Sequence, residues 1–524
     1  MIASLLQFFA ESSSTFYQSR VISLVAVAVT LPVFLPSLWK ILKYIAEEYL
    51  IHKYRWINDE GNAVPGPRPN LPDGDRYTRL QDGYDLSIAY RKAYGRIYRI
   101  WDGFDPELVL TKPEDVAFYY KDGFNHSKKQ SLNIGHFFYM MLGECVGLIH
   151  GEKWKQMRSV VDPFFHNKAV NATVPNIIKS VNDWVHDMPT CPLIDKRTAD
   201  NGFEFPLVHS IKHLPFVLVA QLLYGNCLTQ KDIQFLIDTN EDHEKLVGVC
   251  FTERLPRLKL YRLFPTVNNR RMDKFHEEWA DFNHRMVESS KKSGEATPAS
   301  HMYQAVEEGK LTMMQCLQTI DEILFTNIDV ASSTLAWQLL SLSENVHVQE
   351  KLRKEVLEQM EACGDDIHSQ EFQDYICRSN TYLHYVMLES SRMRPTSAYT
   401  LPEVINEEKN ILGYRIPKGT SVIIDALALN HDAPVWEGDG HNFRPERFYD
   451  LKPAQYRYSL WRFGLGPRKC LGQPYGEKVV RAVLALSVKN YQISQPAGAK
   501  VELFRETFLR MPITQMIFTP LKST

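Results

Sequence analysis

The sequence carries few of the patterns that mark metal-binding or nucleic-acid-binding proteins. Its 524 residues have a net charge of −2, which indicates neither a nucleic acid partner nor a strongly charged substrate. The eight cysteines form no Cys-x-x-Cys pair and no zinc-binding spacing, so we expect a reducing compartment. No internal repeat is visible, and no long linker divides the chain after residue 72. These absences favour one large folded body over several small domains.

One cysteine, Cys470, lies in a glycine-rich segment that runs from Phe463 to Gly472. Glycines let the backbone turn tightly and approach a flat cofactor. The neighbouring Arg468 and Lys469 supply positive charge, which favours a thiolate over a thiol. A lone cysteine is more often a buried structural residue, so the neighbouring residues decide the interpretation. They indicate a thiolate that binds haem iron.

The segment resembles the cytochrome P-450 signature Phe-x-x-Gly-x-Arg-x-Cys-x-Gly. The positions that match are Phe463, Gly466, Arg468, Cys470 and Gly472. A single motif is a hypothesis until others support it. Further motifs of the family occur in the family's order, and the resemblance covers roughly residues 65 to 520. It implies haem b (iron protoporphyrin IX) with Cys470 as the axial ligand, and Phe463 and Arg468 beside it.

Two more motifs carry this resemblance. Glu389 and Arg392 fit Glu-x-x-Arg and share one helix face, because residues three apart are neighbours on a helix. The resemblance implies that they form a buried triad with Arg447. Trp154 and Arg158 fit a Trp-x-x-x-Arg helix, whose side chains bind a haem propionate in the family. The arginine fork suits such a carboxylate.

The resemblance implies a mainly α fold with a minor β region. The residue pattern agrees, because amphipathic helical segments dominate from residue 80 onward, with short β-like runs at 97–101 and 421–425. The Ser- and Lys-rich stretch 289–300 is expected to be a surface loop between two long helices.

A helix through residues 321–337 resembles the family's oxygen-binding helix, with Asp329 as the anchor of the register. By that register Asn327 stands where glycine is usual, and Val330 stands where threonine is usual. Valine has no hydroxyl, and loss of a proton-transfer group costs on the order of 10² to 10⁴ in rate. Something is therefore expected to replace it: Asn327, Thr326, an ordered water, or a group of the substrate.

An alternative is that the register differs by one turn, which would bring Ser333 or Thr334 nearer the iron.

Glu403 is a further departure, because many relatives carry a propionate-binding Arg or His there and a carboxylate would repel the propionates. Either Glu403 turns away, or haem binding depends more on Trp154, Arg158 and Arg468. By resemblance the substrate pocket is mostly apolar. Its expected residues are Phe137, Phe138, Met140, Ser397, Leu401 and Phe508.

Residues 21–39 contain no charge and would span roughly 28 Å as a helix at ~1.5 Å per residue. We expect a transmembrane anchor after an N-terminal segment 1–20, although a cleaved signal peptide is the competing interpretation. Basic residues follow the run, which predicts a cytosolic catalytic domain at the endoplasmic reticulum. A linker with a proline-rich hinge, 40–72, would connect the anchor to a catalytic domain at 73–524.

The sequence therefore predicts a membrane-anchored haem-thiolate monooxygenase that acts on a small, largely apolar organic substrate, in natural-product biosynthesis by its similarity to fungal members. The resemblance implies electrons from NADPH through a flavoprotein reductase, with cytochrome b5 and membrane lipid as further partners. Oxidative coupling, ring formation or rearrangement is the alternative chemistry, as Val330 and Asn327 would permit. A non-catalytic haem- or lipid-binding membrane protein is the alternative from another class.

Overall fold

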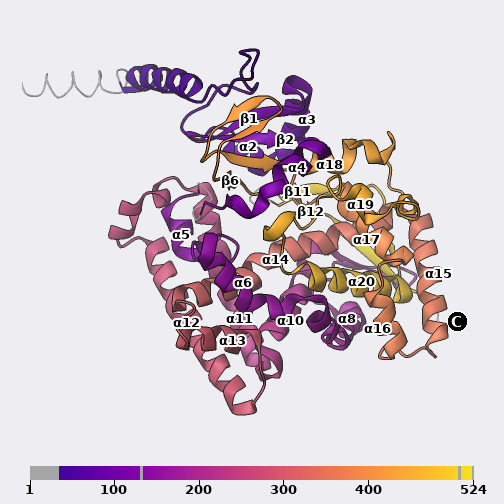
Figure 1. The fold of residues 1–524 in the computed structure, drawn as a ribbon. Coiled ribbons are helices and arrows are strands. Elements are labelled where there is room, and N and C mark those ends of the chain that lie inside the picture. Colours follow the sequence, from indigo (N-terminus) through magenta and orange to yellow (C-terminus); the bar gives the residue numbers. More distant parts are fainter. Residues whose placement is uncertain (1–34, 130–133, 505–508, 522–524) are drawn as a thin grey trace, which may run out of the picture.

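The structure is a computed structural model that describes residues 35–129, 134–504 and 509–521. The predicted mainly α fold with a minor β region is confirmed (Figure 1). Residues 35–53 form a first helix. The later helices are α2 (Arg76–Gln81), α3 (Gly83–Tyr94), α4 (Pro113–Tyr119), α5 (His136–Leu142), α6 (Gly151–Phe165), α7 (Asn167–Asn171), α8 (Val174–Asp187), α9 (Leu207–Ile211), α10 (His213–Tyr224), α11 (Gln230–Thr252), α12 (Val267–Ser293), α13 (Pro298–Glu307), α14 (Met313–Glu344), α15 (Val346–Ala362), α16 (Gln370–Cys377), α17 (Tyr382–Met393), α18 (Ala426–Asp432), α19 (Pro453–Tyr456) and α20 (Gln473–Asn490).

The strands form two larger sheets and two hairpins. The strands are β1 (Ile97–Asp102), β2 (Asp105–Leu110), β3 (His126–Ser127), β4 (Lys196–Arg197), β5 (Phe203–Pro206), β6 (Glu403–Ile405), β7 (Lys409–Ile411), β8 (Tyr414–Ile416), β9 (Ser421–Ile424), β10 (Tyr491–Ser494), β11 (Glu502–Phe504), β12 (Met511–Ile513) and β13 (Gln515–Pro520). The predicted strands at 97–101 and 421–425 are therefore confirmed as β1 and β9.

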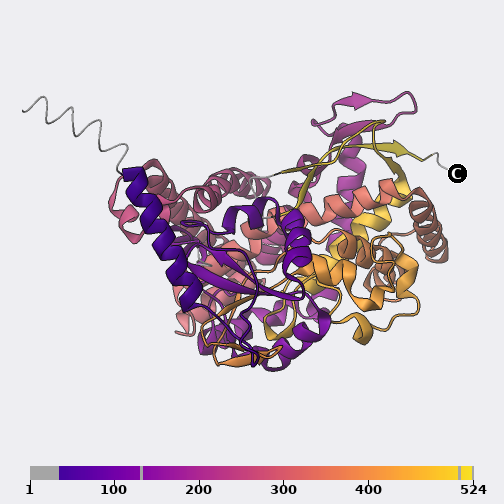
Figure 2. The ribbon, with the colours of Figure 1, turned by 90° about the horizontal axis from the view of Figure 1, so that it is seen from above.

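The five-stranded sheet has the order β1-β2-β9-β6-β3 and lies at one end of the molecule, with α2 and α3 beside it (Figure 1). β2 and β9 are parallel, and β3 pairs antiparallel with β6 so that Ser127 faces Val404. The four-stranded sheet β10-β13-β5-β4 lies on the far side, toward the C-terminus (Figure 2). The register of β3 on β6 matters for the site. If the pairing is continued by one residue beyond Ser127 and Val404, Lys128 lies opposite Glu403.

Helix α14 runs through the centre of the helical body (Figure 1). Its start is fixed by Thr312, whose hydroxyl accepts the N–H of Gln315 while the Gln315 side chain accepts the N–H of Thr312, a capping box. Apolar side chains such as Ile320, Leu324 and Ile328 are buried against its neighbours, which include α10, α17 and α20. Burial on several sides fixes the rotation of α14 about its own axis, and therefore which residues face each neighbour.

The prediction of a surface loop at 289–300 is wrong for most of that stretch. Helix α12 continues to Ser293 because Met286 and Ser290 still lie on its buried stripe. The left-handed Gly294 then ends it, and Thr297 caps α13 by accepting the N–H of Ser300. Only residues 294–297 separate the two helices.

The predicted anchor at 21–39 lies outside the described residues except for 35–39, so it stays a prediction. Within the described chain, one helical stretch is long and apolar enough to cross a membrane: Leu207–Cys227, about half of which (56%) is buried in the protein core.

The predicted proline hinge is bonded to β1, since the Pro65 carbonyl accepts from the Arg99 N–H (2.8 Å) and the Pro67 carbonyl from Trp101 Nε1 (3.0 Å).

Candidate active site

The Cys470 loop is a tight turn that leads into α20. The Cys470 N–H donates to the Phe463 carbonyl at 2.8 Å, which closes the loop. Gly464 and Gly466 have positive φ of 81° and 69°, a conformation that favours glycine. A Cβ on Gly466 would also lie 3.0 Å from the Tyr120 ring, which explains the absence of a side chain there.

The Cys470 thiol lies at the N-terminus of α20. It is near enough to the backbone N–H groups of Gly472 and Gln473 for them to lower its pKa, although burial has the larger effect and raises the pKa overall. The side chain nevertheless has accessible surface, so it lines an interior recess. A sulfur at a helix N-terminus with backbone donors suits a thiolate metal ligand. These residues therefore fit a haem iron bound through Cys470.

The residues expected beside the haem propionates come together. The Arg468 guanidinium lies over the Trp154 ring (5.0 Å to the centroid), and so does that of Arg158 (5.8 Å). Arg468 donates to the carbonyls of Gly147 and Ile149 at 3.0 and 2.8 Å, and burial lowers its pKa. Arg158 also pairs with the nearby Asp162 carboxylate at 2.8 Å. Two guanidinium groups therefore contact one aromatic ring at this edge of the recess.

Glu403 is buried, but it is not left to repel a propionate. His126 Nδ1 lies 3.2 Å and Lys128 Nζ 3.3 Å from its two carboxylate oxygens. Burial acts to raise the pKa of the Glu403 carboxyl, yet Lys128 and His126 together lower it. Sequence reasoning missed both partners of Glu403, because their approach depends on the pairing of β3 with β6. Glu403 therefore holds a lysine and a histidine in place next to Arg468.

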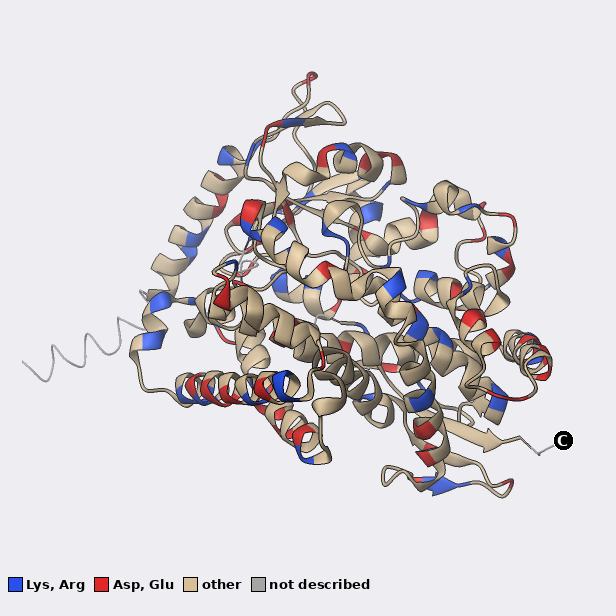
Figure 3. Ribbon diagram, turned by 60° about the horizontal axis from the view of Figure 1, so that its bottom comes forward, with Lys and Arg blue, Asp and Glu red and all other residues tan. Residues whose placement is uncertain are grey.

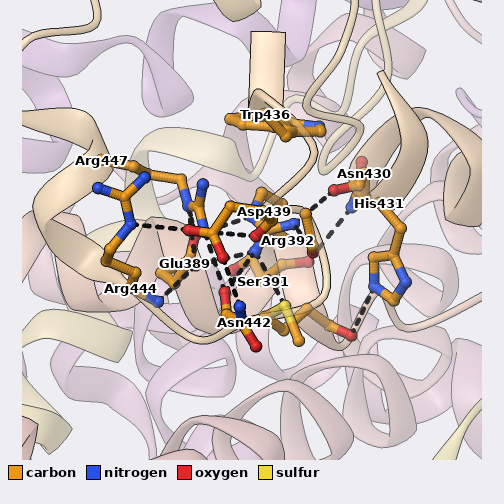
Figure 4. Close-up of polar contacts among 12 residues, drawn as sticks. Glu389, Ser391, Arg392, Asn430, His431, Trp436, Asp439, Asn442, Arg444 and Arg447 are labelled. Atoms are coloured by element: carbon orange, nitrogen blue, oxygen red, sulfur yellow. Dashed lines mark hydrogen bonds and ion pairs between the residues drawn. The ribbon is translucent and has the colours of Figure 1, made fainter. Parts of the chain in front are cut away.

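The three residues of the expected charge triad meet in the core (Figure 4). Arg392 donates from Nε and Nη2 to the two Glu389 oxygens at 2.8 Å each, and Arg447 Nε lies 3.0 Å from Glu389 Oε1. Both Glu389 and Arg392 are fully buried. Trp436 covers the two guanidinium groups, at 5.1 Å from Arg392 and 6.0 Å from Arg447. The triad joins α17 to the segment that precedes the Cys470 loop.

The oxygen-binding helix of the prediction is α14. Asn327 and Val330 are partly exposed, and Asp329 lies 3.9 Å from Lys212, with burial raising the pKa of its carboxyl. The Ser333 hydroxyl donates to the Arg510 backbone carbonyl at 2.7 Å, and the Thr334 hydroxyl donates to the Val330 carbonyl at 2.8 Å. Both hydroxyls therefore donate to backbone carbonyls, and the register of the oxygen-binding helix stays a prediction.

Sequence reasoning also missed Glu322 on α14. Its Oε2 accepts the Gly147 N–H at 3.0 Å, and a Cβ on Gly147 would lie 1.9 Å from its Oε1. Burial raises the pKa of its carboxyl. The carbonyl of the same Gly147 accepts from Arg468, so one glycine joins α14 to the Cys470 loop. The sequence gives no signal of this contact, because a glycine such as Gly147 has no side chain that would indicate its partners.

A cavity of about 1400 Å³ lies between α11, α14, the start of α9 and the β11–β12 hairpin. Its walls include Phe325, Thr326, Asp329, Leu509 and Met511. The described residues of the predicted pocket do not line this cavity. Their positions differ: Phe137 and Phe138 are buried core side chains, the Met140 carbonyl accepts from Gln318, Ser397 donates to the Tyr399 carbonyl, and Leu401 is 49% exposed.

The aromatic residues Phe137 and Phe138 face α11 and its connection to α12 instead, where their rings contact Phe251 and Tyr261. Aromatic residues dominate cores, so an aromatic pair is a weak signal of a ligand wall. Phe508 lies outside the described residues.

Comparison with known proteins agrees with this geometry. The family model for cytochrome P450 matches residues 78–518. The chain is 33% identical to the cytochrome P450 monooxygenase PUL2 of Kluyveromyces lactis, over 90% of this chain and 94% of that protein. It is 34% identical to the cytochrome P450 monooxygenase asaD of Aspergillus flavus (87% and 86%) and 29% identical to gliC of Aspergillus fumigatus (93% and 94%). The chain belongs to the cytochrome P450 family and is a haem monooxygenase.

Proposed function

We propose that this monooxygenase inserts one oxygen atom from O2 into a small, largely apolar organic compound in natural-product biosynthesis. The observation that carries the proposal is Cys470 at the N-terminus of α20, accessible from an interior recess and flanked by Arg468. Family membership sets aside the non-catalytic alternative. Support for an apolar substrate comes from the cavity walls, where Phe325, Leu509 and Met511 lie. Similarity to monooxygenases of Aspergillus species supports a natural-product substrate.

The haem, when bound, supplies the oxygen chemistry, and the thiolate ligand promotes cleavage of the oxygen–oxygen bond. The chain's own residues bind and orient it. Cys470 would hold the iron, while Trp154, Arg158, Arg468 and Lys128 would hold the carboxylates at the haem edge. The Glu389 triad keeps the segment before the loop in place. Each of these groups is set before substrate arrives, which lowers the reorganisation needed for reaction.

The test is reconstitution of the purified protein with a fungal P450 reductase and NADPH. Extracts of fungal metabolites are screened for compounds that shift the Soret band, and those that bind are incubated under 18O2. We expect a product that carries one labelled oxygen atom. Binding compounds that are consumed without any incorporation of label would refute oxygen insertion.

Oxidative coupling or ring formation is the second candidate. It is favoured by Val330 and Asn327, because α14 lacks the usual hydroxyl at 330 and carries an amide at 327. A coupled product would be lighter by two hydrogens and would contain no atom from O2. Mass spectrometry of the same incubations therefore separates the two chemistries.

We also propose that NADPH electrons arrive through a flavoprotein reductase, with cytochrome b5 as a second donor. The support is a group of exposed lysines around the start of α6 and the Cys470 loop: Lys153, Lys155 and Lys469. Lys155 is only weakly held by its neighbour Glu152 at 2.7 Å, since both side chains are largely exposed. Lys155→Glu with Lys469→Glu should slow reduction at low salt and leave the CO spectrum unchanged. Unchanged reduction rates would indicate another docking face.

Attachment to the endoplasmic reticulum membrane, with a cytosolic catalytic domain, is supported by two exposed apolar surfaces. One is the helix 35–53, where Leu38, Trp39 and Leu42 are exposed among lysines (Figure 3). The other is the connection from α11 to α12, which packs on α5 and exposes Leu260 and Leu263. Apolar patches of this kind mark membrane or protein contacts.

The membrane test is deletion of residues 1–40, followed by an alkaline carbonate wash of membranes. We expect most of the protein to be released with its haem retained. Residual binding should disappear when Leu260→Asp and Leu263→Asp are added, because charges replace the second apolar surface. Full retention of the combined variant would refute attachment through these two surfaces.

A further inference from the structure

The hydroxyl of Thr326 differs from the other hydroxyls of α14. The other serine and threonine side chains of this helix all have a hydrogen-bond partner: Thr319, Ser332, Ser333, Thr334, Ser341 and Ser343. Thr326 Oγ1 is buried and has no partner within the described part of the chain. A helical threonine commonly donates to the carbonyl four residues earlier, as Thr334 does to Val330. The Thr326 hydroxyl is therefore left with its donor and acceptor capacity unused.

The position of Thr326 on α14 places it toward the Cys470 loop. Residues four apart share a helix face, so Glu322, Thr326 and Val330 form one stripe. The Glu322 end of the stripe is held to Gly147, whose carbonyl accepts from Arg468 of the Cys470 loop.

Thr326 also borders the cavity of about 1400 Å³, and Asp329 shares that wall. The Asp329 side chain is partly exposed at 38% and lies 3.9 Å from Lys212. A hydroxyl and a carboxyl three residues apart on a helix lie on neighbouring positions of one face. Asn327 is not among the residues that line this cavity, so the amide has no comparable contact with it.

We propose that Thr326 is the catalytic hydroxyl that relays protons in this enzyme, one helical turn before the position that Val330 occupies. This inference rests on the monooxygenase activity. The Thr326 hydroxyl gives its proton to reduced dioxygen on the Cys470 side of α14 and takes another proton from a water that enters from the cavity. Asp329 returns a proton from solvent to that water. The hydroxyl is unchanged after each cycle, one proton moves inward, and the electrons come from NADPH through the reductase.

The test uses the substrate-free holoenzyme with a fungal P450 reductase, NADPH and O2 as the probe. Reduction of O2 to peroxide takes two electrons and two protons, whereas reduction to water takes four of each. Loss of the proton relay should therefore divert O2 from water to peroxide. For Thr326→Val we expect the ratio of peroxide to water to rise at least about tenfold. The NADPH consumed for each O2 should correspondingly fall toward one. Thr326→Ser should keep the wild-type ratio.

Thr334→Val is the matched control, because it removes a hydroxyl of the same helix that is already bonded. Its peroxide ratio should equal that of the wild type. A second measurement is the thermal unfolding midpoint of the ferric protein. Thr326→Val should not lower it, because the hydroxyl makes no hydrogen bond to the described protein groups that valine, which has the same shape, would lose. Thr334→Val should not raise it.

An unchanged peroxide ratio in Thr326→Val overturns the proposal. So does a raised ratio that comes with a lower unfolding midpoint and that Thr334→Val shares, since that pattern indicates general damage to α14. A rise in Asn327→Ala alone would assign the relay to the amide and also overturn it. If the wild type itself consumes no NADPH, the monooxygenase reaction has failed. If the wild type consumes NADPH and Thr326→Val gives the same peroxide ratio, only the relay proposal has failed.

Discussion

Removal of the Glu389 carboxylate should destabilise the protein more than removal of any exposed acid. Glu389 accepts hydrogen bonds from Arg392, Arg447 and the Arg444 N–H, the last at 2.8 Å. Arg392 is fully buried and Arg447 nearly so, at 3% side-chain exposure. In Glu389→Ala the Arg392 guanidinium stays in the core without its anion, and Arg447 keeps only the partly exposed Asp439 carboxylate as its anion, at 3.3 Å.

The magnitude follows from those contacts. Removal of one partner from a buried ion pair costs about 3–5 kcal/mol, because the other charge is left uncompensated. A buried N–H that loses its acceptor adds about 1–3 kcal/mol. Arg392 keeps the carbonyls of Asn430 and Gly440 as acceptors at 2.7 and 2.5 Å, which limits the sum. We expect Glu389→Ala to cost about 4–6 kcal/mol of a total stability of about 5–15 kcal/mol.

The assay is guanidinium unfolding, followed by circular dichroism for the helices and by Soret absorbance for the haem. Glu358→Ala is the matched control, because Glu358 is also a helical glutamate but is 60% exposed and lies 3.9 Å from Lys354. An exposed pair of this kind contributes about 0–1 kcal/mol. If Glu389→Ala loses no more stability than Glu358→Ala, the buried triad does not stabilise the fold as argued.

Three further predictions test the site itself. Cys470→Ala should abolish the red-shifted Soret band of the reduced CO complex, and an unchanged band in that variant would mean that another residue binds the iron. Glu403→Gln should lower the free energy of unfolding in urea by about 3 kcal/mol, because Lys128 loses its anion. Adding Lys128→Met should recover much of that loss. If the effects of the two substitutions simply add, Glu403 and Lys128 are not a coupled pair. Val330→Thr should not increase the product formed per NADPH, because Thr326 already supplies the hydroxyl; a clear increase would show that the missing hydroxyl at 330 limits the wild type.

Local motifs made part of the site predictable. The Cys470 loop is contiguous in sequence, and Glu389 and Arg392 lie three residues apart, so their proximity follows from loop and helix geometry alone. The two strands at 97–101 and 421–425 were predictable from β-branched and aromatic runs. Helix α14 was predictable because its apolar residues repeat at helical spacing.

Long-range contacts made the rest unpredictable. Glu403 meets His126 and Lys128 only because β3 pairs with β6, across 277 residues of sequence. The prediction that Glu403 either turns away or leaves haem binding to depend more on other residues considered Glu403 alone, whereas the structure shows a buried carboxylate paired with Lys128 and His126. Phe137 and Phe138 fit an apolar pocket wall by type, but packing against α11 and the α11–α12 connection decided their place.

The departure at Val330 on α14 can be explained by the shift of a function along the helix. A relay needs a hydroxyl with unused hydrogen-bonding capacity, a path to solvent and a position toward the Cys470 side. A threonine at 330 would meet the last requirement, but its place is taken by valine. Thr326 meets all three, because it shares the stripe with Val330, borders the cavity with Asp329 and has no partner among the described residues. Once the relay is one turn earlier, position 330 is free of the requirement for a hydroxyl, and a valine can stand there.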